Sequence, residues 1–184
     1  MAIALKVQSL WKSYIAGVQG CSARVWALRG CSLEAAMGER IGIVGGRSSG
    51  KTTLLRCLAG HRALDAGRVE TVLSDRCYLA SSPDVQGLPT ALPTSRLLVL
   101  LDFASPRHGG AAHDTLLAAS RLLAPITGVL IIAGLDVASI APLVDRIVLL
   151  RDGHLTEPAR LPVRRVAERP PTSPHVPTFG TRGS

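Results

Sequence analysis

The chain has 184 residues, 47% of them apolar and 18% charged, which is enough for one core and predicts a single domain. The net charge of +8 fits phosphate-bearing ligands or an anionic membrane face. The arginines are dispersed and form no basic groove laced with aromatic residues, so specific nucleic-acid binding is not expected. The first ten residues lack the pattern of a signal peptide, and the most apolar segment, Val129 to Leu135, is much shorter than the about 20 residues that cross a bilayer, so we expect a soluble protein.

Strand and helix signals alternate along the chain. Strands are expected at Ile3 to Gln8, Arg24 to Ala35, Arg40 to Val44, Arg68 to Leu73, Arg76 to Ala80, Leu97 to Leu101, Gly128 to Ala133 and Arg146 to Leu150. Helices are expected at Lys51 to Leu58, at the apolar face of Ala112, Leu116, Ala119 and Leu123, and at Val137 to Leu143. Loops are expected at Tyr14 to Ser22 and Ser81 to Ser95, with a hairpin turn at Asp152-Gly153. The folded domain is expected to cover residues 1–157, before a disordered tail rich in Pro and Arg from Pro158 to Ser184.

The cysteines and histidines show no spacing typical of a metal site. The cysteines sit in apolar or strand-like surroundings, which predicts small buried side chains in a reducing compartment rather than disulfides. They are Cys21, Cys31, Cys57 and Cys77, and the histidines are His61, His108, His113, His154 and His175.

One motif carries chemistry. Residues 45–52 match G-x-x-x-x-G-K-[ST], after the apolar run Ile41 to Val44 and before a segment with helical spacing, Thr53 to Gly60. Glycines let the backbone approach a polyphosphate, whose oxygens meet successive N–H groups and the positive end of the following helix. Lys51 is expected to reach the terminal phosphates, and the Thr52 hydroxyl a magnesium ion. A chance Gly/Ser loop is the alternative, but the strand before it and the helix after it are the context the motif requires.

From roughly Leu5 to Leu155 the chain resembles the nucleotide-binding subunit of ATP-binding cassette (ABC) transporters. The resemblance is specific at both ends and weak in the middle. It rests on Tyr14, the run Val25 to Leu33, the run Gly38 to Gly45, the phosphate loop, and the run Asp145 to Leu155.

The resemblance implies a three-layer P-loop α/β/α domain with a small N-terminal antiparallel sheet and the nucleotide at the carboxyl ends of the parallel strands. It implies that Tyr14 stacks on adenine, with a cap on the first hairpin as the alternative role of this tyrosine. It also implies that Asp102 is the Walker B aspartate that supports magnesium, although a lone Asp after a strand is often a helix cap. The residues expected to bind ATP are Tyr14, Gly45, Gly46, Arg47, Ser48, Ser49, Gly50, Lys51, Thr52 and Thr53, and those expected to hold Mg²⁺ are Thr52 and Asp102.

The chain departs from the family where catalysis is concerned. The glutamate that follows the Walker B aspartate and polarises water is replaced by Phe103, and the switch histidine by Leu135. The family's helical subdomain, which carries the L-S-G-G-Q signature, has only Ser81 to Ser95 in its place, and the glutamine expected after the preceding strand has become Ser81 or Ser82. No catalytic residue can therefore be assigned.

These features predict a truncated, degenerate ABC-type protein that binds Mg-ATP with weak or absent hydrolysis. Its expected partners are a membrane permease subunit or a second ABC cassette. Its expected location is the cytoplasm, either free or peripheral on the cytoplasmic face of the inner membrane. Two alternatives stay open. One is a nonenzymatic structural or regulatory subunit of a membrane complex, and the other is an active ATPase whose water is oriented by an unidentified group such as Asp136 or Ser81. A small-molecule kinase is weaker, because its lid arginines are not recognisable.

Overall fold

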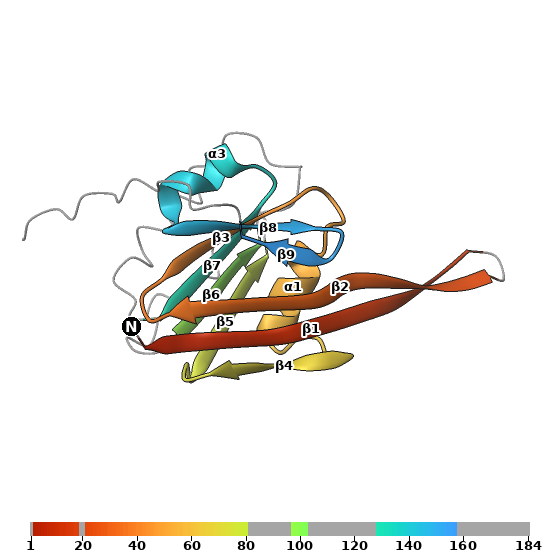
Figure 1. Ribbon diagram of the computed structural model, residues 1–184, viewed down its shortest axis with the longest axis horizontal. Coiled ribbons are helices and arrows are strands. Elements are labelled where there is room, and N and C mark those ends of the chain that lie inside the picture. The colour runs from red at the N-terminus through yellow and green to blue at the C-terminus, as the bar shows by residue number, and fades with distance from the viewer. Residues whose placement is uncertain (1, 19–20, 81–96, 103–127, 158–184) are drawn as a thin grey trace, which may run out of the picture.

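The computed structural model describes residues 2–18, 21–80, 97–102 and 128–157, which form two sheets with a helix packed between them (Figure 1). In chain order the elements are β1 (Ile3–Val18), β2 (Cys21–Ala36), β3 (Arg40–Val44), α1 (Lys51–Leu58), β4 (Ala66–Thr71), β5 (Asp75–Ala80), β6 (Leu97–Asp102), β7 (Val129–Gly134), α3 (Val137–Ile140), the 3₁₀ helix η2 (Ala141–Leu143), β8 (Arg146–Arg151) and β9 (His154–Thr156).

The larger sheet has the strand order β5-β6-β7-β3-β8-β9. Neighbouring strands from β5 to β8 are parallel, and only β9 pairs antiparallel at the edge. Strand β7 is buried along its whole length and β3 along all but its first residue. Continuous apolar runs of this kind are typical of parallel strands covered on both faces. The expected buried strands are therefore confirmed, with bounds that shift by one or two residues.

The smaller sheet, β2-β1-β4, is antiparallel, as expected for the N-terminal segments. Its hairpin corrects the prediction of a loop from Tyr14 to Ser22. Strands β1 and β2 stay paired from Ile3↔Ala36 to Val18↔Cys21, so Tyr14 lies within a strand. The turn signals of the glycines were outweighed by cross-strand pairing, to which a perpendicular contact of the Trp11 and Trp26 rings contributes, with centroids 5.3 Å apart. Figure 1 shows this hairpin reaching beyond the rest of the molecule.

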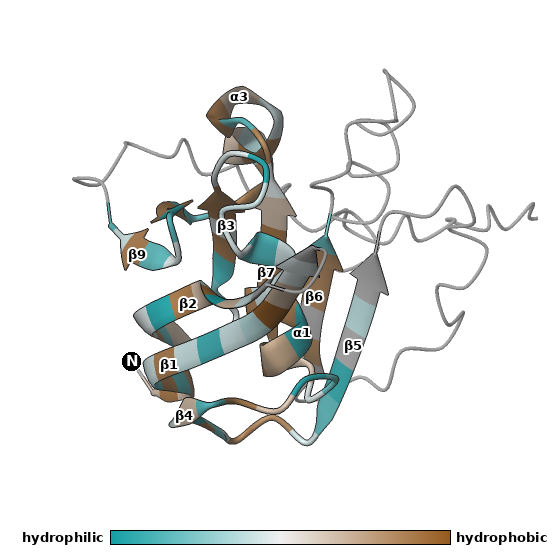
Figure 2. Cartoon of the chain, turned by 90° about the vertical axis from the view of Figure 1, so that its right-hand side faces the viewer, coloured by the Kyte–Doolittle hydropathy of each residue, from teal (hydrophilic) through white to brown (hydrophobic). Residues whose placement is uncertain are grey.

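Two apolar clusters give the domain its layers. The first joins α1 and the antiparallel sheet to one face of the parallel sheet, through residues such as Leu10, Leu54 and Leu100. The second packs α3 and η2 on the opposite face, through Ile140 and Leu143. Figure 2 shows α1 between the hairpin and the strands β6 and β7. The predicted three-layer P-loop fold is thereby confirmed.

Helix α1 has the predicted bounds. The helix expected at Val137 to Leu143 forms as one α-helical turn followed by a 3₁₀ turn, where Pro142 replaces an N–H donor and the helix tightens. The turn Asp152-Gly153 is confirmed, with positive φ at both residues (49° and 80°). The helix expected near residues 112–123, the loop at 81–95, Phe103 and the tail from Pro158 lie outside the described residues.

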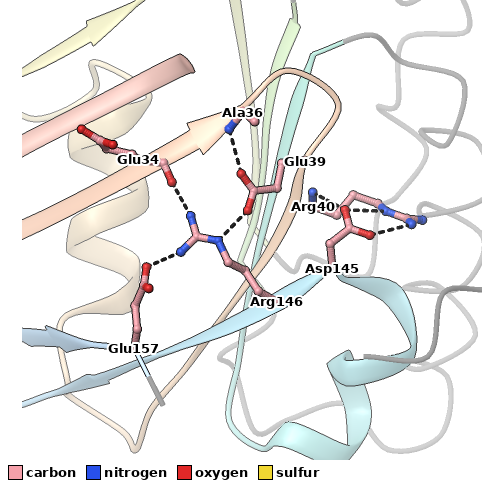
Figure 3. A network of polar contacts seen from close by, with 7 residues as sticks. All are labelled: Glu34, Ala36, Glu39, Arg40, Asp145, Arg146 and Glu157. Carbon is pink, nitrogen blue, oxygen red and sulfur yellow. Dashed lines mark hydrogen bonds and ion pairs between the residues drawn. The ribbon is translucent and has the colours of Figure 1, made fainter. Parts of the chain in front are cut away.

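A polar network ties the amino ends of β3 and β8 to the end of β2 (Figure 3). The guanidinium of Arg146 donates to Glu39 Oε1 at 2.5 Å, to Glu157 and to the Glu34 carbonyl, while Glu39 Oε2 accepts from the Ala36 N–H at 2.7 Å. Beside it, Asp145 accepts three bonds from Arg40, from the backbone N–H at 2.8 Å, from Nη2 at 3.0 Å and from Nε at 3.4 Å. The network links the strands at their amino ends, which form the edge of the sheet opposite the phosphate loop.

Candidate nucleotide-binding site

The phosphate loop runs from the carboxyl end of β3 to the first residue of α1, where the motif predicted it. Two of its glycines pass close to neighbouring backbone. A Cβ on Gly45 would lie 2.2 Å from the Leu150 carbonyl oxygen, and one on Gly50 would lie 2.3 Å from the Ala27 carbonyl oxygen. Gly50, the N-cap of α1, also has φ +105°, which side chains rarely adopt. Because residues 45 and 50 are glycines, the backbone of the loop can pack directly against β2 and β8.

The ammonium group of Lys51 lies within this loop. Its Nζ donates to the carbonyl oxygens of Gly45 at 2.7 Å and Gly46 at 2.5 Å and to Ser49 Oγ at 3.1 Å. Lys51 is 3% exposed and Ser49 is 7% exposed. Burial lowers the pKa of Lys51, and the negative charge of Asp102 acts in the opposite direction. A buried cation is thus held by neutral oxygens of its own loop, at a place where an anionic ligand would stabilise it more strongly.

The start of α1 is suited to an anion. Gly50 has no side chain to cap the helix, and the first turn, Lys51 to Leu54, contains no acidic residue. The first N–H groups and the helix dipole therefore favour negative charge at this end. Arg47 and Ser48 are exposed on the loop, while Thr52 and Thr53 are half-buried in the first turn.

Asp102 ends β6, two strands away from β3, on the same edge of the sheet as the phosphate loop. Its side chain is 6% exposed, and its Oδ2 accepts a hydrogen bond from the Tyr78 hydroxyl at 3.3 Å. A hydroxyl from Thr52 and a carboxylate from Asp102 are the hard oxygen donors that Mg²⁺ prefers, in a site that phosphate and water complete. The residues present therefore fit a magnesium ion bound together with nucleotide. Among the described residues there is no cluster of three or more His, Cys, Asp or Glu that could hold a metal by itself.

Tyr14 lies on β1 over the start of α1. Its hydroxyl donates to Thr53 Oγ1 at 3.4 Å, and Lys12 Nζ lies 5.9 Å from the centre of its ring. The side chain is 38% exposed, so part of the ring is accessible beside the first turn of the helix. The structure thus brings Tyr14 and Thr53 together. Because Tyr14 pairs with Val25 within the hairpin, its position is not that of a hairpin cap.

The side chain of Asp136, one candidate for orienting water, has a structural role. Its Oδ1 accepts from the backbone N–H and the hydroxyl of Ser139, both at 2.8 Å, and caps α3. The backbone hydrogen bond from Ser139, followed by the hydroxyl bond, lowers the pKa of Asp136. Leu135, at the position of the family's histidine, is half-buried and apolar. The other candidate, Ser81, lies outside the described residues.

Two residues beside Asp102 were not singled out from the sequence. Tyr78 bonds Asp102 directly, and a hydrogen bond to Tyr78 raises the pKa of Arg56, which lies in the last turn of α1. Burial raises the pKa of Tyr78 itself. The position of Tyr78 in the sequence could have indicated this contact. Tyr78 comes two residues before the end of β5, and its side chain therefore lies beside the end of the neighbouring parallel strand β6. Cys31 and Cys57 are buried and free, as expected, and the side chains of Cys21 and Cys77 lie outside the description.

The family model described as ABC transporter matches residues 28–88. The teichoic acids export ATP-binding protein TagH of Levilactobacillus brevis is 37% identical over 41% of this chain and 21% of its own length. The Fe(3+) ions import ATP-binding protein FbpC of Mesorhizobium japonicum is 43% identical over 35% of this chain and 16% of its own length. The lipoprotein-releasing system ATP-binding protein LolD of Ruegeria sp. is 38% identical over 40% of this chain and 31% of its own length. The chain therefore spans less than a third of each of these relatives.

Solved structures share the fold over most of the chain. CbiO1 from Clostridium perfringens, part of the ABC transporter complex CbiONQ, superposes with a TM-score of 0.62 at 15% identity, covering 84% of this chain and 87% of that one. An ATP-binding cassette dimer in a post-hydrolysis state, bound to ADP and Pi, gives a TM-score of 0.58 at 14% identity, covering 83% and 98%.

In the described part of the chain, no helix combines the length and apolarity needed to cross a membrane. The family model matches a segment that contains the phosphate loop, and the fold is that of an ABC cassette. Over residues 28–88 this chain is therefore similar in sequence to the ABC transporter ATP-binding family, and its fold is similar to that of ABC cassettes.

Proposed function

We propose that the chain binds ATP together with magnesium through residues 45–52, and that it hydrolyses ATP weakly or not at all. The observation that carries the proposal is the buried Lys51 ammonium, bonded to the carbonyl oxygens of Gly45 and Gly46 and the hydroxyl of Ser49. A fixed cation within a loop at a helix N-terminus is an arrangement for polyphosphate.

Each of the remaining residues has a role in this proposal. Lys51 exchanges its carbonyl partners for phosphate oxygens, and the loop N–H groups bind the other oxygens. Thr52 and Asp102 hold the magnesium ion, which neutralises phosphate charge when bound. The partly exposed ring of Tyr14 offers a face for the base, and its hydrogen bond to Thr53 fixes the ring relative to α1.

Weak hydrolysis follows from the side chains at the two catalytic positions. Phe103 can neither accept a proton nor orient water, and loss of a positioned general base typically costs about 10² to 10⁴ in rate. Leu135 cannot bind a terminal phosphate, and the adjacent carboxylate of Asp136 is engaged in capping α3. Positioning of water and of transition-state charge is most of the catalysis in phosphoryl transfer, so both losses act on the chemical step.

The proposed partners are a membrane permease subunit or a complete second cassette, at the cytoplasmic face of a membrane. CbiO1 is described as part of a transporter complex, and the names of the curated relatives describe export, import and release systems. A chain without a recognisable signature sequence would contribute its own phosphate loop to such an assembly and leave the partner's nucleotide without a signature.

Thermal unfolding with and without Mg-ATP tests the binding. At about 100 times the dissociation constant the ligand stabilises the fold by roughly 2.7 kcal/mol. In a domain of this size that raises Tm by roughly 5 to 11 °C. Lys51→Ala should abolish the shift, whereas Lys6→Ala, which removes the same charge from a surface ion pair with Glu34, should keep it. A wild-type protein whose Tm does not respond to millimolar Mg-ATP would overturn the proposal.

Steady-state phosphate release on the same samples tests the second half of the proposal. Wild type should show little or no release above the Lys51→Ala background, and Phe103→Glu should recover little, because the switch residue and the signature are still lacking. Wild-type turnover of about 1 per second, within the usual enzyme range, that disappears in Lys51→Ala would show an active ATPase.

A further inference from the structure

The hydroxyl of Tyr78 is placed beside Asp102 by the register of two parallel strands. In the β5–β6 pair, Ala80 lies opposite Asp102 and Tyr78 opposite Leu100. Side chains two residues apart in a strand point to the same face, so Tyr78 and Asp102 share a face of the sheet. It is the face that carries α1, because Leu98 and Leu100 pack into the same cluster as Leu54. The hydroxyl thereby reaches the carboxylate from the neighbouring strand.

Asp102 has a hydrogen-bond donor on the neighbouring strand and a positive charge on α1 nearby. Arg56, in the last turn of α1, lies near enough for its positive charge to interact with Tyr78 and Asp102. The Tyr78 hydroxyl in turn donates to Asp102 Oδ2 at 3.3 Å. A donor polarised by a cation is a stronger donor, so the arginine reinforces the bond to the carboxylate. The same helix that begins with Lys51 and Thr52 thus also places the positive charge of Arg56 near Asp102.

We propose that Tyr78 is a positioning residue for the metal-supporting carboxylate of Asp102. The inference rests on the Mg-ATP binding proposed above. By donating to Oδ2, the hydroxyl restricts the rotation of the carboxylate, so that the carboxylate would meet the metal in one orientation. Hydrogen bonds of this kind around a metal-binding carboxylate typically change metal affinity by about 10- to 100-fold.

The role of the hydroxyl can be separated from that of the ring. The ring of Tyr78 packs against the core cluster and meets the His61 ring edge to face, with centroids 5.4 Å apart. Tyr78→Phe keeps both contacts and deletes only the oxygen. His61→Ala does the opposite, since it removes the ring contact on an exposed residue and leaves the hydroxyl and Asp102 unchanged.

The test compares the affinity of the full chain for a fluorescent ATP analogue in magnesium and in excess EDTA. The ratio of the two dissociation constants is the gain due to the metal. Tyr78→Phe should reduce this gain about tenfold, within the range seen for such residues, while leaving the affinity in EDTA unchanged. Arg56→Met should act in the same direction with a smaller effect. His61→Ala should leave the gain as it is in wild type.

The outcomes separate this inference from the proposed function. If wild type binds the analogue with a magnesium gain that Tyr78→Phe and Arg56→Met both retain, Tyr78 does not position Asp102, although nucleotide binding stands. If Tyr78→Phe weakens binding equally in magnesium and EDTA, its role is packing and the inference is wrong. If wild type binds no nucleotide in either condition, both proposals are overturned together.

Discussion

Lys51 and Asp65 illustrate how differently a charge is held inside the fold and on its surface. Lys51 is buried, and its cost in lost hydration is met by three oxygens of its own loop. Asp65 is exposed, but it accepts from Lys12 Nζ at 2.7 Å, from the Ser13 N–H at 2.8 Å and from Ser13 Oγ at 2.5 Å. It joins the segment before β4 to β1 through its charge.

We expect the Asp65 contact to be lost in acid. The side-chain hydrogen bond from Lys12, then those from Ser13, lower the pKa of Asp65 from 3.8 to about 2. Because the folded-state pKa lies below the unfolded one, the contribution to stability is complete above pH 3.8 and is lost as the pH falls towards about 2. Asp65→Asn should therefore flatten the fall of Tm in this window, measured by circular dichroism.

Asp152→Asn is the matched control for this measurement, because it removes the same charge from a turn residue that is 84% exposed. Its Tm should fall with pH as steeply as that of wild type. A wild-type curve that parallels the Asp65→Asn curve between pH 4 and 2 would show that the bonds to Lys12 and Ser13 do not stabilise the fold.

At the residue scale, the sequence was informative where a motif fixes the spacing. The lysine and threonine of the phosphate loop are predictable because their roles depend on backbone that the same eight residues supply. The positions of Tyr14 beside Thr53 and of Tyr78 beside Asp102 depend on pairings between segments 24 or more residues apart. Such contacts leave no local pattern, so neither was predicted, and the stacking of Tyr14 on adenine that the resemblance implies stays a prediction.

At the scale of elements, apolar runs and the loop motif located β3, α1, β6 and β7 to within two residues. The hairpin was the main error. Glycines near residues 17 and 20 resemble loop signals, whereas in the fold each strand provides the hydrogen-bonding partners of the other out to Val18↔Cys21. The length of each strand was therefore decided by pairing with the neighbouring strand, which local propensity does not describe.

Because the phosphate loop packs closely against β2, we expect Gly50→Ala to lower stability by more than the addition of one methyl group usually does. The new methyl group would meet the Ala27 carbonyl oxygen at 2.3 Å, at a residue whose φ of +105° already disfavours any side chain. Backbone strain of this kind costs about 1 to 3 kcal/mol, and relieving the overlap must displace the start of α1. We expect a lower Tm and loss of the stabilisation by Mg-ATP.

Gly38→Ala separates the two contributions to this prediction. Gly38 also has positive φ, at +76°, but nothing lies within 4 Å of a Cβ placed there. Gly38→Ala should lower Tm only through the cost of a side chain at positive φ, and it should leave the response to Mg-ATP unchanged. Equal effects of the two substitutions on nucleotide binding would show that the approach of Gly50 to β2 is unimportant.

At the scale of the molecule, the edge formed by the carboxyl ends of the parallel strands and the edge formed by their amino ends have different roles. The carboxyl edge carries the phosphate loop and Asp102, with a buried cation and a buried carboxylate. The amino edge carries the network around Arg146 and Glu39, together with the pair Arg40–Asp145 (Figure 3). The resemblance to ABC cassettes predicted the layers and the site edge, but not this network, because its partners come from three separate segments.

The Arg146 network predicts a substitution that weakens the fold without affecting the site. Arg146→Met keeps most of the apolar stem but removes the donors to Glu39, Glu157 and the Glu34 carbonyl. The side chains of Arg146 and Glu39 are 25% and 21% exposed, so the remaining carboxylate would be left partly buried. Hydrogen bonds to charged groups contribute about 1.5 to 3 kcal/mol, so we expect a loss of about 2 kcal/mol. In a domain of this size, 2 kcal/mol lowers Tm by roughly 4 to 8 °C.

Arg68→Met is the control for that loss. Arg68 pairs with Glu70 at 2.8 Å, but the two side chains are 69% and 49% exposed, and surface pairs contribute less than about 1 kcal/mol. Chemical denaturation of both variants, with and without Mg-ATP, gives the free energy of unfolding and the increment due to ligand. The increment should equal that of wild type in both, because the network lies at the opposite edge of the sheet from the phosphate loop. An Arg146→Met protein as stable as Arg68→Met would show that the network adds nothing beyond surface charge, and a reduced increment would show that the two edges are coupled.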